Sequence, residues 1–142
     1  MKVTLICTVL NEQKNIGRFI DSIVVQTQLP SEVIIVDGGS TDNTKKEINK
    51  KIKQFSKKIR IRLIEKKGNR SVGRNEAVRH ASCNTIVCSD SGCILDKNWV
   101  RNITKPFENK KVDVVAGYYK GKHHSIFEKS LIPYILIMKD KI

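Results

Sequence analysis

The chain has 142 residues, enough for one domain with a sizeable core, and 39 % of them are hydrophobic while 29 % are charged. This composition is typical of a soluble globular protein and excludes a disordered chain, and no segment reaches the ~18 apolar residues of a membrane span. The charge is unbalanced, because 27 basic residues against 14 acidic ones give a net charge of +13.

The first half of the chain alternates apolar runs with helical patterns. A continuous β-rich run at residues 3–9 predicts a strand buried on both faces, and apolar residues spaced as on one helix face follow over residues 12–26. A second apolar strand is predicted at residues 33–36. The sequence DGGSTD after it contains turn and helix-cap residues, and it leads into a lysine-rich helix that is predicted to reach about Lys58.

Strands and helices keep alternating in the second half. The predicted elements are a strand at 59–65, a helix at 71–82, a strand at 84–89, a helix at 98–107, a strand at 112–116 and a helix from 125 to about 138. This alternation predicts an α/β fold, an α/β/α sandwich with a mostly parallel central sheet. Because no repeat or low-complexity linker interrupts the pattern, residues 1–142 are expected to form a single domain.

Lysines concentrate in the second predicted helix. A basic surface attracts phosphate-rich partners such as nucleotides, nucleic acid or anionic lipid headgroups. The lysines over residues 45–58 recur on what is expected to be one outward helix face, which favours an ordinary solvated surface for that segment.

Three of the predicted strands end in acidic residues although the protein as a whole is basic. Asn11 and Glu12 follow the first strand, Asp37 ends the second, and Asp90 follows the fourth. Ligands of parallel α/β sheets bind outside the carboxyl ends of the strands. Because carboxylates are poor interior residues unless they are paired or liganded, three at one edge predict that a cation, a ribose or a base edge binds there.

The cysteines do not form a recognisable metal motif. Cys83, Cys88 and Cys93 are spaced C-x4-C-x4-C, unlike a zinc knuckle, and Cys7 and Cys88 are expected inside strands as small hydrophobic residues. We therefore expect reduced cysteines. The N-terminal apolar run is too short for a convincing signal peptide, so the expected location is cytoplasmic, including the inner face of the membrane.

Four segments resemble the family 2 glycosyltransferases, which have the GT-A fold. They are TVLNE (residues 8–12), IIVDGGSTDNT (34–44), SVGRNEA (71–77) and SDSGC (89–93), in the family's order and spacing. The resemblance covers nearly the whole chain. The resemblance implies that the protein binds a nucleotide-diphospho-sugar, expected to be a UDP-sugar, and transfers the sugar with inversion. It also implies a divalent cation, Mg²⁺ or Mn²⁺, which commonly bridges the diphosphate to a D-x-D motif. The acceptor, whether glycan, lipid or protein, is left open, as is peripheral association with a membrane.

The resemblance assigns donor-binding roles to particular positions. They are Thr8, Leu10, Asn11, Glu12, Asp37, Gly38, Arg74 and Asp90. Asp37 would accept a hydrogen bond from the base, usually from the N3–H of uracil. Arg74 would face the diphosphate at the start of its helix, where backbone N–H groups also favour anions, and Asp90 would meet the metal or the sugar-phosphate. Ser40, Thr41 and Asp42 are expected to cap the helix that follows them.

The chain departs from the family's pattern at two places. The second carboxylate of D-x-D falls on Gly92, and although Mg²⁺ and Mn²⁺ often take only one or two protein ligands, Asp90 alone is expected to bind a metal weakly. Inverting transfer also needs a general base, and neither Asp113, Glu128 nor Asp140 fits that role, so no catalytic residue is assigned. The chain is thus expected to be the donor-binding part without the acceptor-binding part. It would be a fragment, be completed by a partner chain, or bind a nucleotide-sugar without efficient turnover.

Other functions fit the sequence less well. A sugar-1-phosphate nucleotidyltransferase needs a glycine-rich loop after the first strand, and no glycine occurs before Gly17; a dehydrogenase needs G-x-G-x-x-G. The non-enzymatic alternative is a basic module that binds nucleotides or nucleic acid. Its charge is suitable, but aromatic residues make up only 6 % and no nucleic-acid-binding signature occurs, so no nucleic-acid partner is expected. His123 and His124 are expected to be surface residues rather than ligands of a phosphate or a metal.

Overall fold

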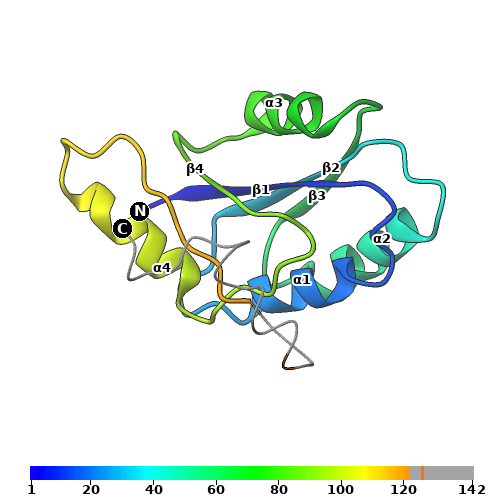
Figure 1. Ribbon diagram of the computed structural model, residues 1–142, viewed down its shortest axis with the longest axis horizontal. Coiled ribbons are helices and arrows are strands. Elements are labelled where there is room, and N and C mark those ends of the chain that lie inside the picture. The colour runs from blue at the N-terminus through cyan, green and yellow to red at the C-terminus, as the bar shows by residue number, and fades with distance from the viewer. Residues whose placement is uncertain (122–125, 127–142) are drawn as a thin grey trace.

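A parallel sheet in the order β3-β2-β1-β4 lies at the centre of the computed structural model, which describes residues 1–121 and Ile126. The strands are β1 (Val3–Val9), β2 (Glu32–Asp37), β3 (Ile61–Glu65) and β4 (Thr85–Cys88). The helices are α1 (Ile16–Val24), α2 (Thr44–Phe55), α3 (Arg70–His80) and α4 (Trp99–Thr104), and a 3-10 turn follows at Lys105–Glu108. Figure 1 shows α3 on one face of the sheet and α1 and α2 on the other. The predicted α/β architecture with a parallel sheet is confirmed.

The two central strands are apolar because both of their faces are covered. Side chains alternate between the faces of a strand, so β1 and β2 each contribute to two clusters. Toward α1 and α2, Leu5 and Cys7 pack with the apolar stripe of α1, and Phe19 is its largest buried side chain. Toward α3, Ile6 packs with Ala77. The expectation of a strand buried on both faces therefore holds for β1, and Cys7 is a buried hydrophobic residue as predicted.

The strand predicted at residues 112–116 is wrong. No element is present at 112–121, and Val114 leaves 84 % of its surface exposed. A strand requires a backbone partner, and within the described residues none pairs with this run, so its high β-propensity is not sufficient. Cys88 also differs from expectation, because it is exposed at the end of β4 rather than buried.

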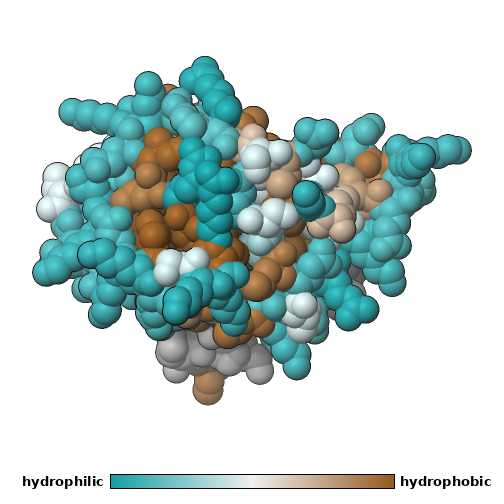
Figure 2. All heavy atoms as spheres, turned by 180° about the vertical axis from the view of Figure 1, so that it is seen from behind, coloured by the Kyte–Doolittle hydropathy of each residue, from teal (hydrophilic) through white to brown (hydrophobic). Residues whose placement is uncertain are grey.

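Several expectations concern the end of the chain. The helix predicted at 125–138, the paired histidines, Glu128 and Asp140 lie outside the described residues. No helix among the residues that the structure describes has the length and apolar character needed to cross a membrane. Figure 2, which shows the molecule from behind, shows a largely hydrophilic face in which apolar residues are visible among the polar side chains.

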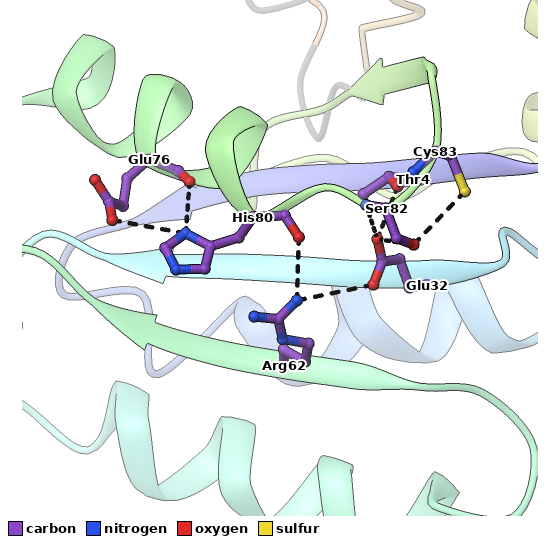
Figure 3. Close-up of polar contacts among 7 residues, drawn as sticks. All are labelled: Thr4, Glu32, Arg62, Glu76, His80, Ser82 and Cys83. Atoms are coloured by element: carbon purple, nitrogen blue, oxygen red, sulfur yellow. Dashed lines mark hydrogen bonds and ion pairs between the residues drawn. The ribbon is translucent and has the colours of Figure 1, made fainter.

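A buried carboxylate ties β2 to the connection between α3 and β4. The Glu32 side chain is almost fully buried, and its Oε1 accepts hydrogen bonds from the hydroxyl groups of Thr4 (2.9 Å) and Ser82 (2.7 Å) and from the Ser82 backbone N–H (2.7 Å). Arg62 on β3 lies 3.9 Å from Oε2 and donates to the carbonyl oxygen of His80 (3.1 Å). Figure 3 shows these side chains meeting at one end of the sheet. The network fixes where α3 ends.

We expect Glu32→Gln to destabilise the protein more at neutral pH than in acid. Burial raises the pKa of Glu32, but the hydrogen bonds from Ser82 and Thr4 outweigh it, and the pKa is lower than its ordinary value of 4.5. The unfolded chain therefore binds this proton more readily, so the stabilisation is complete above that value and is lost as the pH falls below it. The expected loss at about pH 7 is about 1–3 kcal/mol.

Urea unfolding at about pH 7 and about pH 3.5 tests this, because most of the loss should disappear at the lower pH. The control is Glu65→Gln, since the Glu65 side chain is 66 % exposed. An equal loss of stability for Glu32→Gln at both pH values would contradict the expectation.

Candidate functional site

The turn between β2 and α2 is built around the Asp37 carboxylate. Asp37 is the last residue of β2 and is fully buried, deeper than a strand-end residue was expected to lie. Its Oδ1 accepts hydrogen bonds from the backbone N–H groups of Gly39 (2.9 Å) and Ser40 (2.8 Å). Its Oδ2 is also buried and has no hydrogen-bond partner among the described residues. One oxygen thus shapes the turn, and the other remains available to a donor.

Two glycines let this turn fit against its neighbours. A Cβ at Gly38 would lie 3.1 Å from the carbonyl oxygen of Gly68 and 3.4 Å from that of Val9, so a larger residue would crowd two backbones. Gly39 has φ of 110°, which favours glycine. The Gly38 N–H donates to the carbonyl oxygen of Val9 at 2.9 Å. Gly38 therefore brings the ends of β1 and β2 and the loop before α3 together.

A set of hydrogen bonds joins the loop after β1 to the loop after β2. Asn11 has a left-handed backbone (φ 55°), its N–H donates to Ser40 Oγ (2.9 Å), and its Oδ1 accepts from the Thr41 N–H (2.9 Å). The Glu12 N–H donates to Thr44 Oγ1 (2.7 Å). Ser40 and Thr41 were predicted to cap α2, but they bind the other loop instead. Asn11 thereby holds the two loops together.

Two acidic residues in these loops are engaged locally. Asp42 accepts a hydrogen bond from the Thr44 N–H (2.9 Å) in the first turn of α2, which is the capping role expected of it. Glu12 Oε2 accepts from Asn15 Nδ2 (3.0 Å), and the Glu12 carbonyl oxygen accepts from the Asn15 and Ile16 N–H groups (2.9 Å each). Glu12 thus shapes the start of α1.

The start of α3 lies close to the carboxyl end of β1. A Cβ at Gly73 would lie only 2.7 Å from Thr8 Cγ2, so glycine is needed for this approach. The side chain of Asn69 caps the helix by accepting from the Val72 N–H (3.0 Å). Through this packing, α3 carries the next residue, Arg74, to the carboxyl edge of the sheet.

Arg74 and Asp90, read from separate motifs, form an ion pair. Arg74 Nη2 lies 2.8 Å from Asp90 Oδ1, and each side chain is 41 % exposed. The Arg74 Nε is buried and has no partner among the described residues. Although Cys88 is exposed as a residue, partial desolvation raises the pKa of its thiol, and the positive charge of Arg74 opposes this. The expected phosphate-binding cation and the expected metal-binding carboxylate therefore neutralise each other.

Gly92 leaves open space where the second carboxylate of D-x-D would lie. A Cβ at this exposed glycine would meet no atom within 4 Å. Among residues 1–121 and Ile126, no group of three or more His, Cys, Asp or Glu side chains could hold a metal ion. Asp90 is thus the one carboxylate that the D-x-D position offers, and Mg²⁺ and Mn²⁺ can take as few as one or two ligands from a protein.

The predicted residues belong to the loops at the carboxyl ends of the strands and to α3, and the loops after β1 and β2 turn at the right of Figure 1. Asp37 ends β2 and Asp90 follows β4, and β1 lies between these two strands. Neighbouring strands are about 4.8 Å apart, so β2 and β4 lie roughly 10 Å apart on either side of β1. Leu10, which is 56 % exposed, packs near Gly38 beside them. The edge is long enough for an elongated ligand.

Tyr119 was not among the residues predicted from the sequence. Its side chain is 53 % exposed, and partial burial raises the pKa of its hydroxyl, as do the charges of Cys93 and Asp90. The run that precedes it had been interpreted as a strand, and a Tyr-Tyr pair without periodicity was the only local signal.

A parallel α/β sheet whose carboxyl edge carries paired charges and a buried, unpartnered carboxylate oxygen is typical of proteins that bind a polar ligand at that edge. The chain belongs to glycosyl transferase family 2, whose sequence model matches residues 4–137. The resemblance seen in the sequence is therefore confirmed.

Individual relatives agree with this assignment. Glycosyltransferase GlyA of Streptococcus pneumoniae is 27 % identical over 124 residues, which are 87 % of this chain and 18 % of GlyA. Poly(ribitol-phosphate) beta-N-acetylglucosaminyltransferase TarP of Staphylococcus aureus is 29 % identical in an alignment of 137 positions that covers 90 % of this chain and 41 % of TarP. The chain thus spans less than half the length of these relatives.

A solved structure has the same fold. The mannosyltransferase PcManGT from Pyrobaculum calidifontis, in complex with GDP-Man and Mn²⁺, superposes with a TM-score of 0.68 at 27 % identity. The match covers 73 % of this chain and 31 % of PcManGT. The expected GT-A fold is confirmed.

Proposed function

We propose that this chain is the donor-binding part of a glycosyltransferase that moves a sugar from a nucleotide-diphospho-sugar, a UDP-sugar, to an acceptor with inversion. The observation that carries the proposal is the buried, unpartnered Oδ2 of Asp37 on the same edge as Arg74 and Asp90. Family membership and the GDP-Man complex of PcManGT support a nucleotide-sugar donor. We further propose that the reaction takes place in the cytoplasm, including the inner face of the membrane.

Asp37 would recognise the base through Oδ2. A buried carboxylate oxygen without a hydrogen bond costs free energy, and a ligand N–H would remove that cost. The N3–H of uracil is such a donor. Since Oδ2 is buried, a neighbouring side chain must move to admit the base. Leu10 and Lys67, which pack near Gly38 and Gly39, are exposed and can move without opening the core.

Arg74 would hold the diphosphate. Guanidinium–phosphate hydrogen bonds are charge-assisted, and the N-terminus of α3 adds backbone N–H groups that favour an anion. On donor binding, Arg74 would exchange the Asp90 carboxylate for phosphate oxygens. During transfer it would stabilise the negative charge that develops on the leaving diphosphate.

Asp90, once released by Arg74, would help to hold a divalent cation together with the diphosphate. When bound, the cation would neutralise charge on the leaving group. Inverting transfer also requires a base that takes the acceptor's proton, and we assign that role to none of the described residues. The proposed function of residues 1–121 is therefore to bind and orient the donor.

Titration of UDP, GDP and a short oligonucleotide tests the proposal. UDP is expected to bind with a shallow salt dependence, because one arginine and one base contact hold it. Nucleic acid bound through many phosphate contacts would instead show a steep dependence. If the oligonucleotide binds and neither nucleotide does, the chain is a basic nucleic-acid-binding module. If GDP binds and UDP does not, the donor is still a nucleotide-diphospho-sugar, but its base is guanine and not uracil.

Gly92→Asp is expected to create a metal site that is present before the donor binds. A Cβ at this position meets no atom within 4 Å, and the aspartate would supply the second carboxylate of D-x-D. Without UDP, the wild type should bind Mn²⁺ only weakly, and the variant should bind it at least about tenfold more tightly.

The matched control is Gly92→Ala, which fills the same space without a ligand. Calorimetry or the electron paramagnetic resonance signal of free Mn²⁺ reports the binding. Tight Mn²⁺ binding by the wild type without UDP would show that Gly92 is not what limits the site.

A further inference from the structure

The outer face of α2 and the segment after it carry positive charge that the fold does not use. We call this surface the basic face; it comprises Lys46, Lys50, Lys53, Lys57, Lys58 and Arg60, all exposed. The three lysines within the helix are separated by four and three residues, so at about 100° per residue they lie within about 60° of arc. They form one stripe rather than a scattered set.

Acidic partners lie beside the basic face rather than on it. The other two lysines of α2 are paired, Lys45 with Glu65 (3.0 Å) and Lys51 with Asp21 (2.6 Å). Among the described residues, no salt bridge joins any member of the basic face to an acid, and Glu47 is the only acidic residue that lines the hollow between its lysines. The basic face therefore remains positively charged after these two ion pairs are counted.

The far end of the basic face surrounds a hollow. A hollow of ≈ 400 Å³ is lined by Ile52, Ile59 and Ile61 and bordered by Lys57, Lys58 and Arg60. Ile59 and Ile61 are each only 7 % exposed, so the hollow offers little apolar surface, and it is its cationic border that matches an anionic headgroup. A lysine stripe that is merely solvated does not require such a hollow.

We propose that the basic face docks onto a membrane surface rich in anionic phospholipid. Each Lys or Arg near such a surface raises partitioning about fivefold, so six on one side of the molecule produce strong but salt-sensitive binding. Single-stranded nucleic acid fits less well, because its bases need aromatic stacking platforms. The only aromatic side chain of α2, Phe55, is half-buried and lies under the ammonium group of Lys51 (5.6 Å).

The docked orientation leaves the candidate site accessible. α2 starts at the carboxyl edge, just after the Asp37 turn, and extends about 18 Å away from it. The membrane would therefore run along one side of the molecule and not across the edge that carries Asp37, Arg74 and Asp90. Binding to the membrane does not depend on the function proposed for that edge, so the two can be tested separately.

Sedimentation with vesicles tests the proposal. The protein should bind vesicles of phosphatidylcholine that contain about one-third phosphatidylserine, should not bind phosphatidylcholine alone, and should be released at high salt. The triple substitution Lys46→Glu, Lys50→Glu and Lys53→Glu should weaken binding at least about 100-fold. The control reverses three exposed lysines elsewhere, Lys97, Lys105 and Lys111, with the same change in net charge.

The control variant should keep most of the vesicle binding, and circular dichroism should show that both variants are folded. Equal losses in the two variants would mean that net charge, and not this face, controls binding, and the proposal would fail. The proposal would also fail if the wild type does not bind anionic vesicles. The same holds if the triple substitution abolishes binding to an oligonucleotide while vesicle binding is unchanged.

Discussion

Asp37→Asn is expected to weaken UDP binding by about 10- to 100-fold while changing the free energy of unfolding by less than about 1 kcal/mol. Asparagine keeps one carbonyl oxygen, which can still accept from the Gly39 and Ser40 N–H groups that Oδ1 now holds. The other oxygen, Oδ2, becomes an NH₂ group. The new NH₂ group and the uracil N3–H are both donors, so no hydrogen bond can form between them. The substitution therefore removes base recognition and preserves the turn.

Two further measurements separate recognition from folding. Asp37→Ala leaves both backbone N–H groups and the turn without an acceptor, so UDP binding should fall and stability should fall by about 1–3 kcal/mol. Cytosine N3 is an acceptor, so Asp37→Asn should bind CDP more tightly than it binds UDP, the reverse of the wild type. Calorimetry with both nucleotides reports this preference. Unchanged UDP affinity in Asp37→Asn would remove Oδ2 from the site.

The sequence was informative about which residue ends β2 but not about how deeply it lies. An apolar run that stops at a carboxylate and a glycine pair identifies Asp37 by local pattern alone. Its full burial depends on the loop before α3, whose Gly68 backbone approaches Gly38. That approach joins segments about thirty residues apart, and no period of 2 or 3.6 residues encodes it.

The same limit explains the pairing of Arg74 with Asp90. Each residue belongs to a motif that could be recognised by itself, and the two are 16 residues apart. Their contact requires α3 to approach β1 at Gly73. That approach is possible because Gly73 has no side chain that would collide with Thr8 on β1. The prediction at 112–116 failed for a related reason, since whether a β-prone run becomes a strand depends on a partner strand elsewhere.

Arg74→Gln should weaken UDP binding by about 10- to 100-fold and leave uridine binding unchanged, because the guanidinium would contact only the diphosphate. The control is Arg79→Gln on the same helix, whose side chain is 72 % exposed and paired with Glu76; it should bind both ligands as the wild type does.

Asp90→Asn gives the opposite result if the two residues compete as proposed. The substitution releases Arg74 from its 2.8 Å ion pair, so without any divalent cation UDP should bind at least as tightly as it binds to the wild type. With Mn²⁺ present, the variant should lose the additional affinity that the cation provides. Calorimetry in the presence of a chelator and then of Mn²⁺ separates the two effects.

If Arg74→Gln weakens the binding of uridine and of UDP equally, Arg74 supports the shape of the site and does not bind the phosphates. If Asp90→Asn weakens UDP binding in the chelator, Asp90 positions Arg74 instead of competing for it.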